Sequence, residues 1–159
     1  MSMKIVGAHV VFHRMVNTPF DKDGKQRSMP AVLLYKRTQD APIHPSYWAL
    51  IGGCPERQEN PKSALCREAR EELKAGGLEQ ALECLKNLCR VDMLTEQGKV
   101  SIEYFTVPLN EDMDTLKLLR NPNGKVEGEG LAWFTEEEVH HLHMRPEDRQ
   151  ALNTFFKNE

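Results

Sequence analysis

The stretch of residues 53–75 constrains the fold more than any other part of this 159-residue chain, because signals for both ends of a helix lie within it or directly after it. Asn60 is a favourable N-cap residue, and Pro61 suits the first helical position. Two successive glycines, at positions 76 and 77, favour termination at the other end. The pattern therefore predicts a helix over residues 61–75.

Acidic side chains gather on one edge of this predicted helix. At about 100° per residue, Glu68, Glu71 and Glu72 fall on one arc next to an apolar stripe. The stripe consists of Leu65, Ala69 and Leu73. Like charges three or four residues apart cost about 0.2–0.5 kcal/mol per pair, and a bound divalent cation reverses that sign. Because Mg²⁺ favours carboxylate oxygens together with waters and phosphates, this edge predicts a cation site.

Gly52 and Gly53 precede the helix and add a second feature. Residues without a Cβ let the backbone approach a ligand closely. A carbonyl oxygen in this turn can complete a metal shell, and an amide can face a phosphate. The net charge of −3 agrees with such a site, because a mildly acidic chain can bind a phosphate anion when a metal ion neutralises it.

With these residues in place, the stretch resembles the Nudix box. In that pattern a glycine, five residues, a glutamate and seven residues precede Arg-Glu-U-x-Glu-Glu-x-Gly-U, where U is aliphatic. Six positions match in register: Gly53, Glu59, Arg67, Glu68, Glu71 and Glu72. Lys74 stands where the family has glycine, and the glycine pair arrives two residues later. We interpret this departure as a helix extended beyond its usual end.

The resemblance implies an α/β (α+β) fold, a Nudix-type α/β/α sandwich with a mixed β-sheet. It also implies that Arg67 pairs with Glu59 and fixes the loop against the helix. The implied metal ligands, for Mg²⁺ or Mn²⁺, are the carboxylates of Glu68, Glu71 and Glu72 and the carbonyl oxygen of Gly52.

The general base stays open at this level, because members of the family differ in it. The candidates are Glu71 within the box and Glu127 or Glu129, which precede Trp133 in the sequence. Any of these carboxylates can take the proton of a metal-activated water that attacks phosphorus.

The resemblance further implies hydrolysis of the diphosphate bond in a nucleoside diphosphate linked to another group. We expect a small nucleotide-like substrate, first a (deoxy)nucleoside triphosphate, including those with non-standard bases. A nucleotide sugar, ADP-ribose or a dinucleoside polyphosphate is the alternative, although tyrosine or proline markers of the last two are absent at the expected distance after Lys74. A non-catalytic Nudix-fold regulator is a further alternative. The retained box carboxylates favour the enzyme.

Composition bounds the remaining possibilities. A chain that is 40% hydrophobic and 28% charged suits a single domain over residues 1–159. The net charge gives no basic field for binding polymeric nucleic acid. Because no stretch approaches the ~18 apolar residues of a membrane span, we expect a cytoplasmic protein without a membrane partner. We also expect a monomer or a homodimer. Four cysteines without any Cys-x-x-Cys spacing favour reduced thiols over a zinc site or disulfides.

Strand and helix patterns surround the box. Val6, Ala8, Val10 and Phe12 alternate as in a strand that packs on a core through one face. The predicted strands are residues 4–14, 31–37, 47–50, 90–94, 99–109 and 131–134. The predicted helices, besides residues 61–75, are residues 78–88, a helix opened by a capping box at Thr135 and Glu138, and residues 145–157.

Two further groups of residues receive no catalytic assignment. The first is the histidine group His140, His141 and His143, which has no matching cysteine or acidic spacing. The second consists of Trp48, Tyr104 and Trp133, because large aromatics in strands suit a core better than base stacking.

Overall fold

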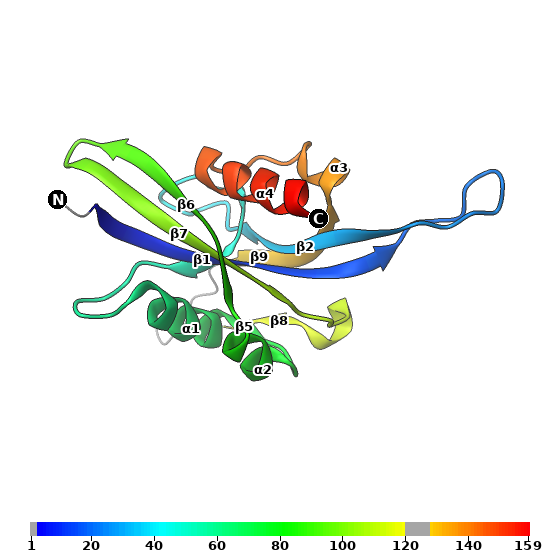
Figure 1. Cartoon of the computed structure of the whole chain (residues 1–159), viewed down its shortest axis with the longest axis horizontal. Helices are drawn as coiled ribbons and strands as arrows, with labels where there is room; N and C mark the ends of the chain where they lie inside the picture. The colour runs from blue at the N-terminus through cyan, green and yellow to red at the C-terminus, as the bar shows by residue number, and fades with distance from the viewer. Residues whose placement is uncertain (1–2, 120–127) are drawn as a thin grey trace.

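The computed structural model describes residues 3–119 and 128–159, and Figure 1 shows a central sheet with helices on both of its faces. The strands of this sheet are β1 (Lys4–Asn17), β2 (Ser28–Arg37), β3 (Trp48–Ala49), β4 (Ile51–Gly53), β6 (Lys86–Thr95), β7 (Gly98–Pro108) and β9 (Gly128–Thr135). Within the described ranges they join in the order β3-β2-β1-β7-β6, with β4 also paired to β1 and β9 to β2. The β1–β7 pair is parallel and the other pairs are antiparallel, so the sheet is mixed as predicted.

The helices form the two outer layers. α1 (Pro61–Glu72) and α2 (Leu78–Glu83) cover one face through one apolar core, to which they contribute Leu65, Ala69 and Leu82. α3 (Glu136–Val139) and α4 (Pro146–Asn158) cover the other face, where Leu152 and Phe155 belong to a second core. This arrangement confirms the predicted α/β/α sandwich.

The predicted alternation of β1 holds along most of the strand but is wrong at its start. Ala8, Val10 and Phe12 all lie in the core on the α1 side. Val6 packs instead against the core on the α4 side. The pairing of β1 with β7 has an irregularity between Ile5 and Gly7, and such a bulge moves the following residues to the opposite face.

α1 begins where the sequence predicts, but it ends earlier than predicted. The Asn60 side chain accepts a hydrogen bond of 2.8 Å from the Ser63 amide, and Pro61 follows at the first helical position. The helix ends at Glu72, and Leu73 has an extended backbone. The prediction of a helix to residue 75 is therefore wrong.

Strand pairing explains the early end of α1. β5 (Leu73–Lys74) pairs with β8 (Lys117–Leu118), which follows the short 3-10 helix η1 (Met113–Thr115). In addition, the Leu119 amide donates to the carbonyl of Glu72. Residues 73 and 74, which local signals assign to the helix, therefore pair as a strand with a segment more than forty residues later in the chain.

The second predicted helix is also shorter than its sequence pattern. α2 ends at Glu83, and β6 already begins at Lys86, which pairs with Thr106 of β7. The predicted strands 90–94 and 99–109 correspond to β6 and β7. The capping box at Thr135 and Glu138 is present, although the helix that it opens has a single turn.

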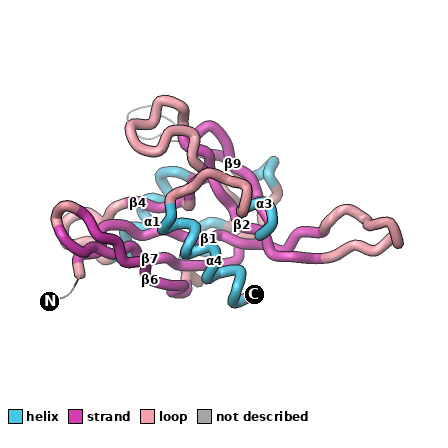
Figure 2. Tube along the Cα trace, turned by 90° about the horizontal axis from the view of Figure 1, so that it is seen from above, coloured by secondary structure: helices cyan, strands magenta, loops and turns pink. Residues whose placement is uncertain are grey.

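β1 and β2 continue beyond the body of the molecule as a hairpin arm, which Figure 2 shows projecting to one side. Its tip is closed by Asp21, whose carboxylate accepts hydrogen bonds from the Asp23 and Lys25 amides. Asp21, Asp23 and Gly24 are residue types that favour such a turn. None of the helices in the described ranges is long and apolar enough to cross a membrane.

Candidate active site

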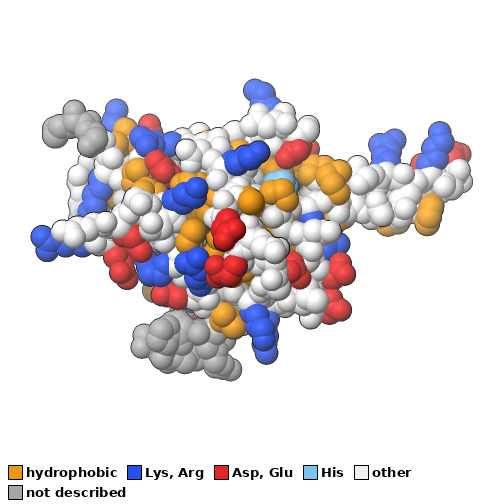
Figure 3. Space-filling model, turned by 60° about the horizontal axis from the view of Figure 1, so that its bottom comes forward, with side chains coloured by type: hydrophobic (Ala, Val, Ile, Leu, Met, Phe, Trp, Pro, Cys, Tyr) orange, Lys and Arg blue, Asp and Glu red, His pale blue; other side chains and the backbone are white. Residues whose placement is uncertain are grey.

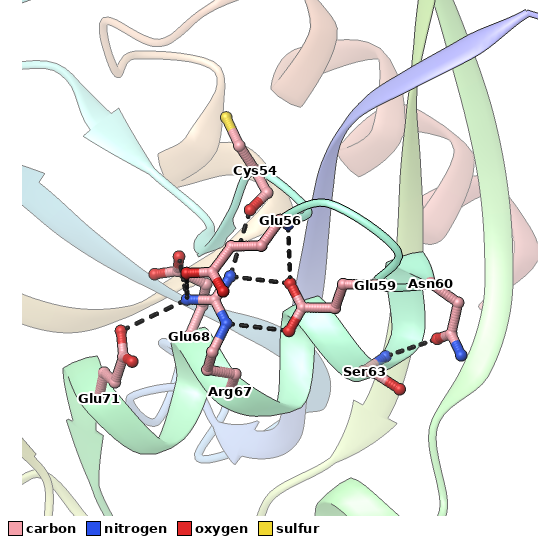
Figure 4. Close-up of polar contacts among 8 residues, drawn as sticks. All are labelled: Cys54, Glu56, Glu59, Asn60, Ser63, Arg67, Glu68 and Glu71. Carbon is pink, nitrogen blue, oxygen red and sulfur yellow. Dashed lines mark hydrogen bonds and ion pairs between the residues drawn. The ribbon is translucent and has the colours of Figure 1, made fainter.

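Arg67 of α1 connects the helix to the preceding loop. Its guanidinium donates from Nε and Nη2 to the two carboxylate oxygens of Glu59, each at 3.0 Å (Figure 4). Nη2 also donates to the Cys54 carbonyl at 3.3 Å. The loop carboxylate is thus bound by a two-point contact, which is more directional than a single ion pair. The pairing that the resemblance implies is present.

The remaining nitrogen of Arg67 lies among three more carboxylates. Nη1 is 2.9 Å from Glu68, 3.6 Å from Glu71 and 3.8 Å from Glu56. We call these three residues and Glu59 the acidic cluster. Four carboxylates around one guanidinium leave an excess of negative charge, and Figure 3 shows acidic and basic side chains side by side on this face. A further cation is therefore favoured here.

The ionisation of the pair follows from these contacts. The hydrogen bonds from Arg67 hold the pKa of Glu59 below its ordinary value. The same bonds, together with Glu68, raise the pKa of Arg67. Both groups therefore stay charged near neutral pH, which keeps the loop attached to the helix.

The two glycines before α1 make close contacts with different elements. A Cβ on Gly53 would lie 2.5 Å from the Glu68 Cδ, so the missing side chain makes room for this carboxylate. A Cβ on Gly52 would instead lie 2.1 Å from the Ala8 carbonyl oxygen and 2.5 Å from Nδ1 of His9. Glu68 thus lies against Gly53, the residue that follows Gly52 in the chain.

The box carboxylates differ in exposure. Glu72 is 8% exposed, the Glu68 side chain is 18% exposed and the Glu71 side chain is 44% exposed. Glu68 and Glu72 thus turn away from bulk solvent, and Glu71 is the most accessible of the three. In the part of the chain that the structure describes, no three acidic, histidine or cysteine side chains are close enough to hold a metal ion alone. These oxygen donors fit Mg²⁺ in its usual mode, where waters and substrate phosphates complete the shell.

Of the two late candidates for the base, Glu129 belongs to the described residues. The Glu129 carboxylate is exposed and accepts a hydrogen bond of 2.9 Å from the Gln39 amide. Within the described ranges, the hydrogen bonds of Arg67 go to Glu59, Glu68 and Cys54 and not to Glu129. Glu127 lies outside the described residues.

Sequence reasoning missed Glu56 and His9. Glu56 belongs to the acidic cluster, and its amide donates to Glu59 at 2.9 Å. The signal available for Glu56 was its place three residues before Glu59, the spacing of a turn. His9 faces Gly52 through the β1–β4 pairing, and no local pattern reveals such a partner 43 residues later.

The large aromatic residues pack against other side chains, as expected for residues of a core. Tyr104 is 1% exposed and belongs to the core. Trp48 packs edge-to-face on Phe134, with ring centroids 4.7 Å apart, and the Arg14 guanidinium lies over Trp133. All four cysteines are free thiols, as predicted.

Comparison with known families matches residues 12–155 to the NUDIX domain. A search of curated protein sequences finds no significant match. Solved structures share the fold at low identity. The MutT protein from Methanosarcina mazei superimposes with a TM-score of 0.64 at 16% identity, covering 100% of this chain and 99% of its own.

Two other structures are similar over nearly their whole length. The dihydroneopterin triphosphate pyrophosphohydrolase of E. coli gives a TM-score of 0.62 at 18% identity, covering 99% of this chain and 100% of its own. The NUDIX domain of Shewanella oneidensis NrtR, complexed with ADP ribose, gives 0.64 at 13% identity, covering 99% and 90%. At these identities, the likeness concerns the fold.

Proposed function

The chain belongs to the Nudix family, enzymes that hydrolyse pyrophosphate bonds, and on this premise we propose that its substrate is a (deoxy)nucleoside triphosphate, including those with non-standard bases. The solved relatives include a MutT protein and an enzyme named for a triphosphate, which supports this class. The observation that supports metal-dependent cleavage of its diphosphate bond is the acidic cluster around Arg67.

The proposed metal ligands are Glu68, Glu71 and Glu72 of α1, with the Gly52 carbonyl oxygen. The contact of Glu68 with Gly53 supports its part, because the carboxylate is held at the junction of loop and helix. Bound there, Mg²⁺ or Mn²⁺ supplies charge neutralisation on the phosphates and an acidified water.

We assign the proton transfer to Glu71. This carboxylate is accessible and lies within the acidic cluster, whereas Glu129 is engaged by the Gln39 amide. In the proposed reaction a water oxygen bonds to phosphorus, the bond from phosphorus to the bridging oxygen breaks, and Glu71 accepts the proton of the water. The leaving phosphate departs with the bridging oxygen.

Arg67 and Glu59 hold the loop in this scheme. Their two-point contact connects residues eight positions apart and fixes the loop against α1. Because the guanidinium is occupied by Glu59, Glu68 and the Cys54 carbonyl, its proposed task is positioning.

The test is a panel of nucleotides assayed for phosphate products with Mg²⁺ or Mn²⁺. The panel contains canonical and oxidised nucleoside triphosphates, ADP-ribose, a nucleotide sugar and a dinucleoside tetraphosphate. Glu68→Gln removes one proposed ligand charge without changing size. Glu83→Gln, which changes an exposed glutamate of α2, is the matched control.

We expect hydrolysis of a nucleoside triphosphate by the parent and the control, and a loss of about 10²-fold or more in Glu68→Gln. If only ADP-ribose is hydrolysed, the proposed substrate class is wrong, whereas the proposed catalytic site still stands. If no compound is hydrolysed, or if Glu68→Gln equals the parent, the catalytic role of the acidic cluster is wrong.

A further inference from the structure

A second polar group lies on the other face of the sheet, behind Gly52. It consists of His9 on β1, Tyr104 on β7, and Arg145 and Asp148 at the start of α4, and we call it the His9 cluster. The proposed reaction uses none of these side chains. Its location raises the question of what it contributes to the loop before α1.

Asp148 is the centre of the His9 cluster. It is 1% exposed, and its carboxylate accepts 2.7 Å and 3.0 Å hydrogen bonds from the Tyr104 hydroxyl and from Nη2 of Arg145. A buried carboxylate is tolerated when it is paired and hydrogen-bonded in this way. Burial and the neighbouring carboxylate raise the pKa of Tyr104, so its hydroxyl remains the donor. The one carboxylate is balanced by the one guanidinium.

Arg145 extends this group to His9. Its Nη2 lies 3.4 Å from Nε2 of His9, and the His9 ring stacks on Tyr104 with centroids 5.7 Å apart. Burial lowers the pKa of His9, which favours the neutral imidazole beside Arg145. The ring is thus fixed from two sides by residues of β7 and α4.

His9 in turn contacts the glycine turn. His9 and Gly52 are direct partners in the antiparallel β1–β4 pair. A Cβ on Gly52 would lie only 2.5 Å from Nδ1 of His9, so the backbone of Gly52 rests against the ring. Nδ1 is buried at this contact, and the Leu50 backbone beside Gly52 also acts on the His9 ring.

We propose that His9 is a positioning residue that fixes the backbone of Gly52 from the face of the sheet opposite α1. Arg145, Asp148 and Tyr104 hold its ring. Groups that orient metal ligands typically change metal affinity or activity by about 10–100-fold when removed. The inference rests on the proposed function only where it treats the Gly52 carbonyl as a metal ligand. It couples α4 to the loop before α1.

The experiment measures three properties of full-length protein. Amide hydrogen exchange at Gly52 and Gly53 reports backbone order without substrate or metal. Mn²⁺ binding by electron paramagnetic resonance reports the ligand set, and steady-state kinetics separate kcat from KM. The variants are His9→Ala, His9→Phe, which keeps a ring, and Arg145→Met, which keeps length. The matched control is Arg90→Met, which removes an exposed ion pair with Glu103 on the same sheet.

We expect His9→Ala to speed exchange at Gly52 by about ten-fold and to raise the Mn²⁺ dissociation constant by about ten-fold. kcat should fall by a similar factor, with KM changed less than two-fold. His9→Phe should restore most of the exchange protection, because a ring again supports Gly52. Arg145→Met should show a smaller change of the same sign, and Arg90→Met none.

Unchanged exchange at Gly52 in folded His9→Ala overturns the inference. If His9→Ala does not fold, unchanged exchange in both His9→Phe and Arg145→Met overturns it equally. Because hydrogen exchange needs no turnover, faster exchange in a protein that hydrolyses no nucleotide supports the positioning role while contradicting the proposed function.

Discussion

The two polar groups that face each other across β4 differ in charge and in exposure. The acidic cluster sets four carboxylates around one guanidinium, and most of its side chains reach solvent. The His9 cluster sets one carboxylate against one guanidinium, and its carboxylate is buried. In the proposed function, the side with unbalanced charge binds the metal ion, and the side with balanced charge positions the backbone that contributes to the site.

This comparison has an energetic form. Like charges repel, so an accessible cluster of carboxylates favours the binding of a cation. A buried and satisfied group costs free energy when one partner is removed, because the other is left without a hydrogen bond. Substitutions in the acidic cluster should therefore lower activity, whereas loss of a hydrogen bond in the His9 cluster should lower the free energy of unfolding.

The largest expected effect separates Glu71 from Glu129. Glu71→Gln removes a carboxylate of the acidic cluster and should lower kcat/KM by about 10²–10⁴-fold, the range for a general base. Glu129→Gln should lower it less than ten-fold, because its carboxylate binds the Gln39 amide. Steady-state kinetics on both variants make the comparison. The reverse ranking would move the base to the late loop.

Gly53→Ala should have the next largest effect. The new Cβ would lie 2.5 Å from the Glu68 Cδ and must displace this carboxylate, so activity and Mn²⁺ affinity should fall by about 10–100-fold. Gly130→Ala is the matched control, because no heavy atom lies within 4 Å of a Cβ there. Equal activity of the two variants would show that activity does not depend on the position of the Glu68 carboxylate against Gly53.

The features predictable from the sequence were local ones. Asn60, Pro61 and the capping box at Thr135 act through neighbours within four residues, and each has its expected role in the structure. The box residues are equally local, since Arg67 reaches Glu59 across one loop.

The features that sequence reasoning missed depend on distant strands. α1 ends early because Leu73 pairs with Leu118, and a residue-by-residue helix pattern contains no information about that partner. Val6 changes face because of a bulge in the pairing with β7. The contact between His9 and Gly52 arises from strand register alone. Tertiary pairing thus decided these points against local preference.

Replacing Arg67 tests the loop side of the comparison. Arg67→Ala should speed amide exchange in residues 54–59 and lower activity by about ten-fold, because the contacts to Glu59 and Cys54 are lost. Arg70→Ala, on the same helix as Arg67, breaks an exposed pair with Glu79 of α2 and should do neither. Unchanged exchange in the loop would contradict the positioning role of Arg67.

Tyr104→Phe tests the supporting side and should affect activity least. Loss of the hydroxyl leaves the buried Asp148 one hydrogen bond short, so the free energy of unfolding should fall by about 1–3 kcal/mol. kcat should change less than about three-fold while the protein is folded. Denaturant unfolding and kinetics give the two numbers. A large loss of kcat without loss of stability would contradict a role of the Tyr104 hydroxyl in stability alone.

The most direct test of the central claim is cation binding at the edge of α1. Mn²⁺ is titrated into the protein with a bound nucleotide and followed by electron paramagnetic resonance, for the parent, the double variant Glu68→Gln with Glu72→Gln, and Glu83→Gln. The account predicts binding by the parent and by Glu83→Gln, and at least a ten-fold weaker affinity in the double variant. Equal binding by all three proteins, or none by the parent, would contradict it.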